Sequence, residues 1–114
     1  MANDARRLGT DFETEVVAYL RKRGLEAQRL ARTGRLDQGD IFIDHGDGIV
    51  VECKARRAAN SPANLRLWLD QAHREAGNYA KARGLEQIPT PILVVKNPNH
   101  STGKAFVIQY LGDL

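Results

Sequence analysis

The sequence has a single cysteine, few histidines and no long apolar run. Cys53 alone excludes an internal disulfide framework and a zinc site built from several cysteines. The 3 histidines are scattered and lack the spacing of zinc ligands. No apolar run approaches the roughly 18 residues that a membrane span needs, and the N-terminus lacks the apolar core of a signal peptide. We therefore expect a cytoplasmic protein without a membrane partner.

What the sequence contains is typical of a globular domain. Its 114 residues are 42% hydrophobic and 27% charged, which predicts one domain over residues 1–114 with a modest core. The 17 basic and 14 acidic residues give a net charge of +3. This mild excess favours a polyanionic partner.

Hydrophobic periodicity predicts an α/β fold. We expect the elements to follow one another as a helix over 4–23, strands over 25–31, 41–44 and 49–55, a helix from 62 to its end at Gly84, and strands over 92–95 and 105–111. The continuous apolar run 92–95 favours a central strand. The α-β-β-β-α-β-β order implies a mixed β-sheet flanked by helices.

Glu13 interrupts the apolar face of the first predicted helix. At about 100° per residue, it falls inside the arc formed by Phe12, Val16, Val17 and Leu20. A carboxylate that faces a core is costly unless it is paired or bound to a metal. Two interpretations follow, namely a salt bridge to a nearby arginine and a ligand of a metal ion.

A second group of charges lies in the strands that the 45–48 hairpin joins. Glu52 and Lys54 are two residues apart and therefore share a face. If the loop is 46–48, Asp40 lies across from Lys54 and diagonal to Glu52. A tighter turn at Asp47-Gly48 would place Asp40 on the opposite face. The sequence leaves both registers open, and the grouping of charges selects the longer loop.

This group has two interpretations of its own. It could be a cross-strand ion pair on a solvated face. However, Val50 and Val51 indicate a strand that is buried on both faces, and Glu13 also faces inward. Three acids and a lysine that converge on an apolar region predict a divalent-metal site, and oxygen ligands favour magnesium or manganese over zinc.

The order of these residues resembles the PD-(D/E)XK nuclease motif. Gly39-Asp40 is followed after 11 residues by Glu52-Cys53-Lys54, with glycine where the motif name has proline. From about Leu8 to Lys96 the chain resembles the archaeal Holliday junction resolvases and their phage relatives, in which a glycine precedes a helical glutamate by four residues, as Gly9 precedes Glu13.

Two further segments carry the resemblance. Thr33-Gly34 stands where those resolvases have a catalytic serine followed by glycine, so the hydroxyl is kept and the serine is not. Gln71-Ala72 and then Tyr79-Ala80 are similar to their second-helix pattern. The resemblance implies a restriction-endonuclease-like core and a magnesium-dependent endonuclease, most closely a Holliday junction resolvase.

The resemblance also implies a role for each residue of the site. Asp40 and Glu52 would hold one or two magnesium ions, for which manganese can substitute, with the carbonyl of Cys53 as a further ligand. Glu13 would complete the site directly or through a water molecule. Lys54 would orient the attacking water or stabilise charge in the transition state.

The remaining positive charge supplies candidates for DNA binding. Setting aside the three acids raises the net charge from +3 to +6. The arginines that flank the proposed site in sequence are candidates for phosphate contacts: Arg6, Arg7, Arg29, Arg32, Arg35, Arg56 and Arg57. The resemblance adds Thr33 and Gln71. With aromatic residues at 6%, recognition of backbone and shape is favoured over base stacking.

The proposed substrate also predicts an oligomeric state. A four-way junction has approximate two-fold symmetry, and one small domain carries one site, so we expect a homodimer. Candidate contacts are Leu67 and Trp68 on the second helix and the final strand from Phe106. The alternatives are a restriction-like or nicking nuclease without junction preference, an inactive DNA-binding module of the same fold, and a small structural or assembly protein.

Overall fold

The computed structural model describes residues 2–31, 36–55 and 62–114, with no account of the side chains of residues 2–6. Two long helices and five strands follow the predicted order: α1 (Ala2–Lys22), β1 (Ala27–Arg29), β2 (Ile41–Ile43), β3 (Ile49–Lys54), α2 (Pro62–Arg83), β4 (Thr90–Val95) and β5 (Phe106–Ile108). Short 3₁₀ helices at Thr102–Lys104 and Leu111–Asp113 flank β5. No helix in the described ranges is long and apolar enough to cross a membrane.

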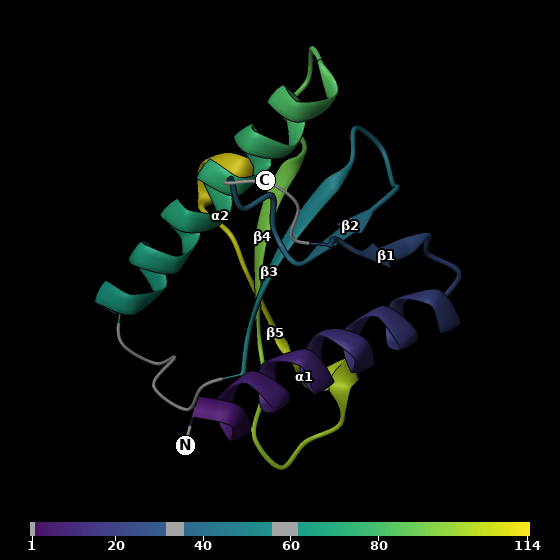
Figure 1. The fold of residues 1–114 in the computed structure, drawn as a ribbon, viewed down its shortest axis with the longest axis vertical. Helices are drawn as coiled ribbons and strands as arrows, with labels where there is room; N and C mark the ends of the chain where they lie inside the picture. The colour runs from purple at the N-terminus through teal and green to yellow at the C-terminus, as the bar shows by residue number, and fades with distance from the viewer. Residues whose placement is uncertain (1, 32–35, 56–61) are drawn as a thin grey trace.

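The strands form one mixed sheet in the order β1-β2-β3-β4-β5 (Figure 1). Among the strand pairs of the described residues, β3–β4 alone is parallel, and α2 lies in the crossover that a parallel pair requires. The interior position predicted for β4 is confirmed, since it lies between β3 and β5. The α/β class and the mixed sheet flanked by helices are therefore confirmed.

The two helices cover opposite faces of the sheet. Ile41 and Val51 pack with Phe12 of α1 on one face, whereas Val50 packs with Tyr79 of α2 on the other. Side chains alternate along a strand, so β3 needs apolar residues at consecutive positions to fill both layers. The prediction from Val50 and Val51 is confirmed, because both are fully buried.

The register of the β2–β3 hairpin differs from the predicted one. Ile43 pairs with Ile49 and Ile41 with Val51, so the loop is two residues longer than the three-residue loop selected from the sequence. Two backbone turns account for it, because the N–H of His45 donates to Ile43 and that of Gly48 to His45. The predicted register was wrong by two residues, which moves Asp40 from Lys54 toward Glu52. An even shift leaves every side chain on its predicted face.

Candidate active site at the start of β2

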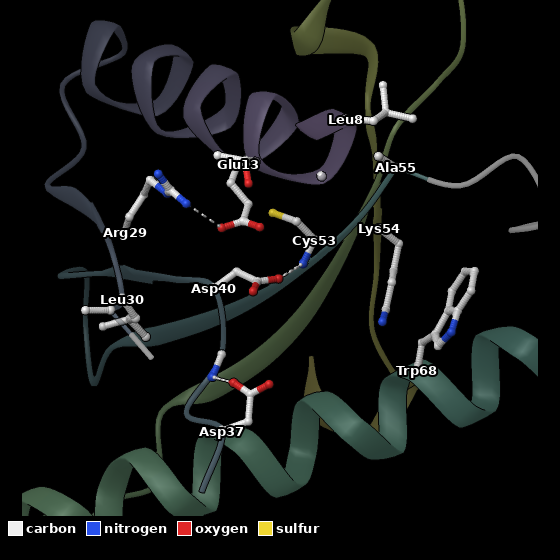
Figure 2. A pocket seen from close by; sticks show the side chains of 14 residues that line it. Leu8, Glu13, Arg29, Leu30, Asp37, Asp40, Cys53, Lys54, Ala55 and Trp68 are labelled. Carbon is white, nitrogen blue, oxygen red and sulfur yellow. Dashed lines mark hydrogen bonds and ion pairs between the residues drawn. The ribbon is translucent and has the colours of Figure 1, made fainter. Parts of the chain in front are cut away.

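Asp40 directly precedes β2 and is bound to β3 by two hydrogen bonds. Its backbone N–H donates to the carbonyl of Val51 at 2.9 Å, and its Oδ2 accepts the backbone N–H of Cys53 at 2.8 Å. Figure 2 shows this carboxylate beside Cys53, directed toward the space below α1. Two backbone anchors thus fix the position of the first predicted metal ligand.

Gly39 brings Asp40 to this position. Its φ of +101° lies in a region that side chains other than hydrogen rarely adopt, and a Cβ there would lie 2.6 Å from Cγ1 of Val50. Proline holds φ near −65°, so it does not fit this backbone. This geometry explains why glycine stands where the nuclease motif name has proline. The N–H of Gly39 also donates to Oδ1 of Asp37 at 3.0 Å.

Glu13, Asp40 and Lys54 line one open cavity of about 960 Å³ (Figure 2). Glu13 extends from α1 toward the strands, while the carboxylate of Asp40 is directed to the backbone N–H of Cys53. Glu13 also forms an ion pair with Arg29, with 3.3 Å between Oε1 and Nη2. The arginine partner that the sequence allowed for is therefore present, and Glu13 lines the cavity as well.

Glu52 lies on the other face of the sheet. It is 5% exposed and faces α2, whereas the side chain of Cys53 packs in the layer under α1. Nζ of Lys54 lies 3.2 Å from Oε2 of Glu52. Glu13 and Glu52 therefore lie on opposite faces of the sheet, with Asp40 near both of them.

A side-chain amide of α2 connects Glu52 with Lys54. Oε1 of Gln71 accepts a hydrogen bond from Nζ of Lys54 at 3.2 Å, and Nε2 donates to Oε2 of Glu52 at 3.2 Å. The same Nε2 donates to Oε1 of Glu75 at 2.8 Å. Gln71, predicted as a DNA contact, therefore has its amide bonded within the protein.

Burial and mutual repulsion raise the pKa values of the acids. Burial first, and then the charge of Glu52, raise the pKa of Asp40 to about 7. Burial and the neighbouring Glu75 raise the pKa of Glu52 to about 8. Burial also raises the pKa of Glu75. The charged forms of Asp40 and Glu52 are therefore disfavoured in the metal-free protein, and a bound cation would stabilise them.

The donor chemistry of the site fits a hard divalent cation. Among the residues that the structure describes, no group of three or more acidic, histidine or cysteine side chains is already arranged around one metal position. However, Oε1 of Glu52 is buried and has no hydrogen-bond partner in those ranges. A buried carboxylate oxygen without a hydrogen-bond partner, close to a second carboxylate, is a suitable ligand for magnesium or manganese.

Several predicted DNA contacts lie outside the described residues: Arg32, Thr33, Arg35, Arg56 and Arg57. The side chain of Arg6 is also not described. Arg7 is exposed on α1, and Arg29 lines the cavity beside Glu13.

The sequence analysis missed Glu75. It is 2% exposed and belongs to the acidic group through Gln71. Its position four residues before Tyr79, at the edge of the buried stripe of α2, was the available signal.

Comparison of the chain with protein-family models and with curated proteins finds no match.

Proposed function

We propose that this protein is a metal-dependent endonuclease of the PD-(D/E)XK type that hydrolyses phosphodiester bonds in DNA. The observation that carries the proposal is the grouping of Asp40, Glu52 and Lys54 where β2 begins and β3 ends. Oδ2 of Asp40 is anchored on Cys53 N, and Nζ of Lys54 lies 3.2 Å from Glu52. A mixed sheet with a helix on each face is compatible with a restriction-endonuclease-like core.

Asp40 and Glu52 are the residues that would hold the metal, with the carbonyl of Cys53 and the carboxylate of Glu13 as further oxygen donors. A bound magnesium ion lowers the pKa of its water and neutralises charge on the phosphate. The anchoring of Asp40 to the backbone keeps one donor in place in advance. Lys54 supplies a positive charge where charge develops on the phosphate, because its ammonium group lies beside Glu52 at the cavity.

The cavity has the character of a phosphate-binding groove. It is open, its lining includes Arg29 and Lys54, and α1 contributes Gly9 and Thr10 close to Glu13. The net charge of +6 outside the three acids supports binding along a DNA backbone. Within this class we propose branched DNA as the substrate, on the strength of the motif order in α1, β3 and α2. A nuclease that cleaves linear duplexes without junction preference is the second candidate.

The inactive DNA-binding module is the less favoured alternative. A fold that had lost its chemistry would be free to replace the buried acids, whose burial is costly. In this chain Asp40, Glu52 and Lys54 are all present, and Glu52 and Glu75 are hydrogen-bonded to one amide. The presence of the complete set favours an enzyme over a module that only binds.

The test is incubation of the purified protein with a labelled four-way junction, a nicked duplex and a linear duplex of the same sequence. Each substrate is tested with magnesium, with manganese and with EDTA. We expect metal-dependent cleavage of the junction that is faster than cleavage of either duplex. Equal cleavage of all three would favour the restriction-like alternative, and no cleavage with either metal would overturn the proposal.

A further inference from the structure

Glu75 is a buried acid without a role in the proposed chemistry. It lies on α2, 2% exposed, and Oε1 accepts a hydrogen bond from Nε2 of Gln71 at 2.8 Å. This is the shortest of the hydrogen bonds given above for the Gln71 amide, because those to Lys54 and Glu52 both measure 3.2 Å. Burying a carboxylate carries a free-energy cost, which its hydrogen bond to Gln71 offsets in part.

The chemistry of the three partners allows one orientation of the Gln71 amide. The ammonium of Lys54 only donates, so it requires the amide oxygen. The Glu52 and Glu75 oxygens that Gln71 contacts accept, so they require the amide nitrogen. Turning the amide by half a rotation would set nitrogen against ammonium and oxygen against two carboxylates. Glu75 contributes to the preference without contacting Lys54.

We propose that Glu75 is a positioning residue: it holds the Gln71 amide in the orientation that keeps Lys54 beside Glu52. The inference rests on the proposed function, in which Lys54 acts on the phosphate. Gln71 and Glu75 are four residues apart on one helix, so the helix backbone places them together in advance. The acceptor for Lys54 and the residue that orients it therefore both belong to α2.

Lys54 needs such support because its four-carbon side chain is flexible. Nζ of Lys54 also lies 5.4 Å from the ring centroid of Trp68. Gln71 and Trp68 both belong to α2, so one helix positions both of these side chains beside the ammonium group. Without Glu75 the amide keeps only its two longer hydrogen bonds, to Glu52 and Lys54, so the preference for the orientation that directs Lys54 is weaker.

The test compares two variants of Glu75. Glu75→Gln keeps an oxygen that accepts from Gln71, whereas Glu75→Met has a similar length and no strong acceptor. The first readout is the side-chain amide signal of Gln71 in NMR spectra, assigned by its loss in Gln71→Met. We expect slow hydrogen exchange of this amide in the wild type and in Glu75→Gln, and fast exchange in Glu75→Met. Circular dichroism checks folding, and Glu75→Ala replaces the Met variant if that variant does not fold.

The second readout is the single-turnover rate of DNA cleavage with magnesium. Loss of a supporting hydrogen bond costs about 10-fold to 100-fold in comparable sites, and we expect a loss of this size in Glu75→Met with DNA affinity unchanged. Glu75→Gln should keep the larger part of the rate. The double variant Gln71→Met/Glu75→Met should be no slower than Gln71→Met alone, because both act through one contact.

Three results would overturn the inference. They are an unchanged rate in a folded Glu75→Met variant, a loss in Glu75→Gln as large as in Glu75→Met, and additive losses in the double variant. The second of these would mean that the charge of Glu75 matters and not its hydrogen bond. If the wild type cleaves no DNA, the proposed function fails, and amide exchange still decides whether Glu75 holds Gln71.

Discussion

Asp40 accepts the backbone N–H of Cys53 through Oδ2 at 2.8 Å, so a side chain at the start of β2 bonds the main chain of β3. The same carboxylate lines the cavity as a proposed metal ligand. Asp40 therefore contributes to the fold and to the chemistry through one group, and substitutions that differ in hydrogen bonding separate the two contributions.

Asp40→Asn should be more stable than Asp40→Ala. Asparagine keeps an oxygen that accepts from Cys53, whereas alanine leaves that N–H without its partner, at a cost of about 1–3 kcal/mol. Chemical denaturation of both variants measures the difference. Equal stabilities would mean that the hydrogen bond to Cys53 contributes little to the fold.

Gly39→Ala should destabilise the protein by more than Gly46→Ala does. Both glycines have positive φ, at +101° and +59°, but only at Gly39 would the new Cβ approach another atom closely, at 2.6 Å from Val50. Left-handed backbone alone costs an ordinary residue about 1–2 kcal/mol, which is the loss expected for Gly46→Ala. Thermal unfolding of the pair measures the excess at Gly39. Equal losses would show that the contact with Val50 is relieved at no cost.

The metal-free protein should lose stability as the pH rises from about 4 to about 8 through the titration of Glu52. Its pKa is about 8 in the folded chain and 4.5 as the ordinary value, so between the two the folded state holds more protons than the unfolded state. Stability from this group is therefore present at low pH and is lost as the pH approaches 8.

Glu52→Gln removes this loss. Its unfolding temperature should exceed that of the wild type at alkaline pH by at least about 4 °C, roughly the shift for 1 kcal/mol in a domain of this size, and by less in acid. Differential scanning fluorimetry across the pH range checks this. Magnesium should stabilise the wild type at alkaline pH and leave Glu52→Gln nearly unchanged. An increase in stability from Glu52→Gln that is equal at every pH would contradict the assignment.

Glu13→Gln tests whether Glu13 acts only as the ion-pair partner of Arg29 or also as a metal ligand. The pair is partly exposed, with 46% of the Arg29 side chain accessible, so its loss should cost under about 1 kcal/mol. If Glu13 also supplies an oxygen to the metal, Glu13→Gln raises the magnesium concentration needed for half-maximal cleavage, whereas Arg29→Gln leaves it unchanged. Stability and the magnesium dependence of cleavage in both variants give the comparison. An unchanged magnesium dependence in Glu13→Gln would show that Glu13 does not serve as a metal ligand.

The predicted homodimer has two candidate surfaces in the structure. Strand β5 is an edge of the sheet, where Phe106 and Val107 are 53% and 63% exposed, and Leu67 on α2 is 66% exposed. We expect a dimer by sedimentation at micromolar concentration. Val107→Lys should give a monomer if β5 pairs across the two-fold axis, and Leu67→Lys should do so if α2 forms the interface. A wild type that stays monomeric on junction DNA would contradict both the dimer and the junction-resolving function.

The sequence predicted the order of the elements, because the periodicity of apolar residues reflects which faces are buried. Val50 and Val51 identified β3 as buried on both faces for this reason. The hairpin register was missed, because it depends on two backbone turns that residues 44–48 do not specify by composition. The error was an even number of residues, which keeps side chains on the same face, so Asp40 still lies close to Glu52 as predicted.

The parts of the site that could not be predicted depend on contacts between elements that are far apart in the sequence. The side of the sheet from which Glu13 approaches follows from the packing of α1 on β1 and β3, which local patterns do not contain. Glu75 was missed because a lone glutamate at the edge of a helical stripe is usually solvated. Only the fold reveals that Gln71 connects Glu75 with Lys54 and Glu52.

A single-turnover cleavage assay of three proteins tests whether the acids beside Lys54 serve metal-dependent cleavage of DNA. The wild type, Asp40→Asn and the exposed hairpin variant Asp47→Asn are compared on a labelled four-way junction with magnesium and with EDTA. Asp47→Asn makes the same substitution at an exposed residue that does not line the cavity. We expect cleavage by the wild type and Asp47→Asn with magnesium only, and none by Asp40→Asn, although all three bind the junction. Cleavage by Asp40→Asn at the wild-type rate, or cleavage in EDTA, would contradict this expectation.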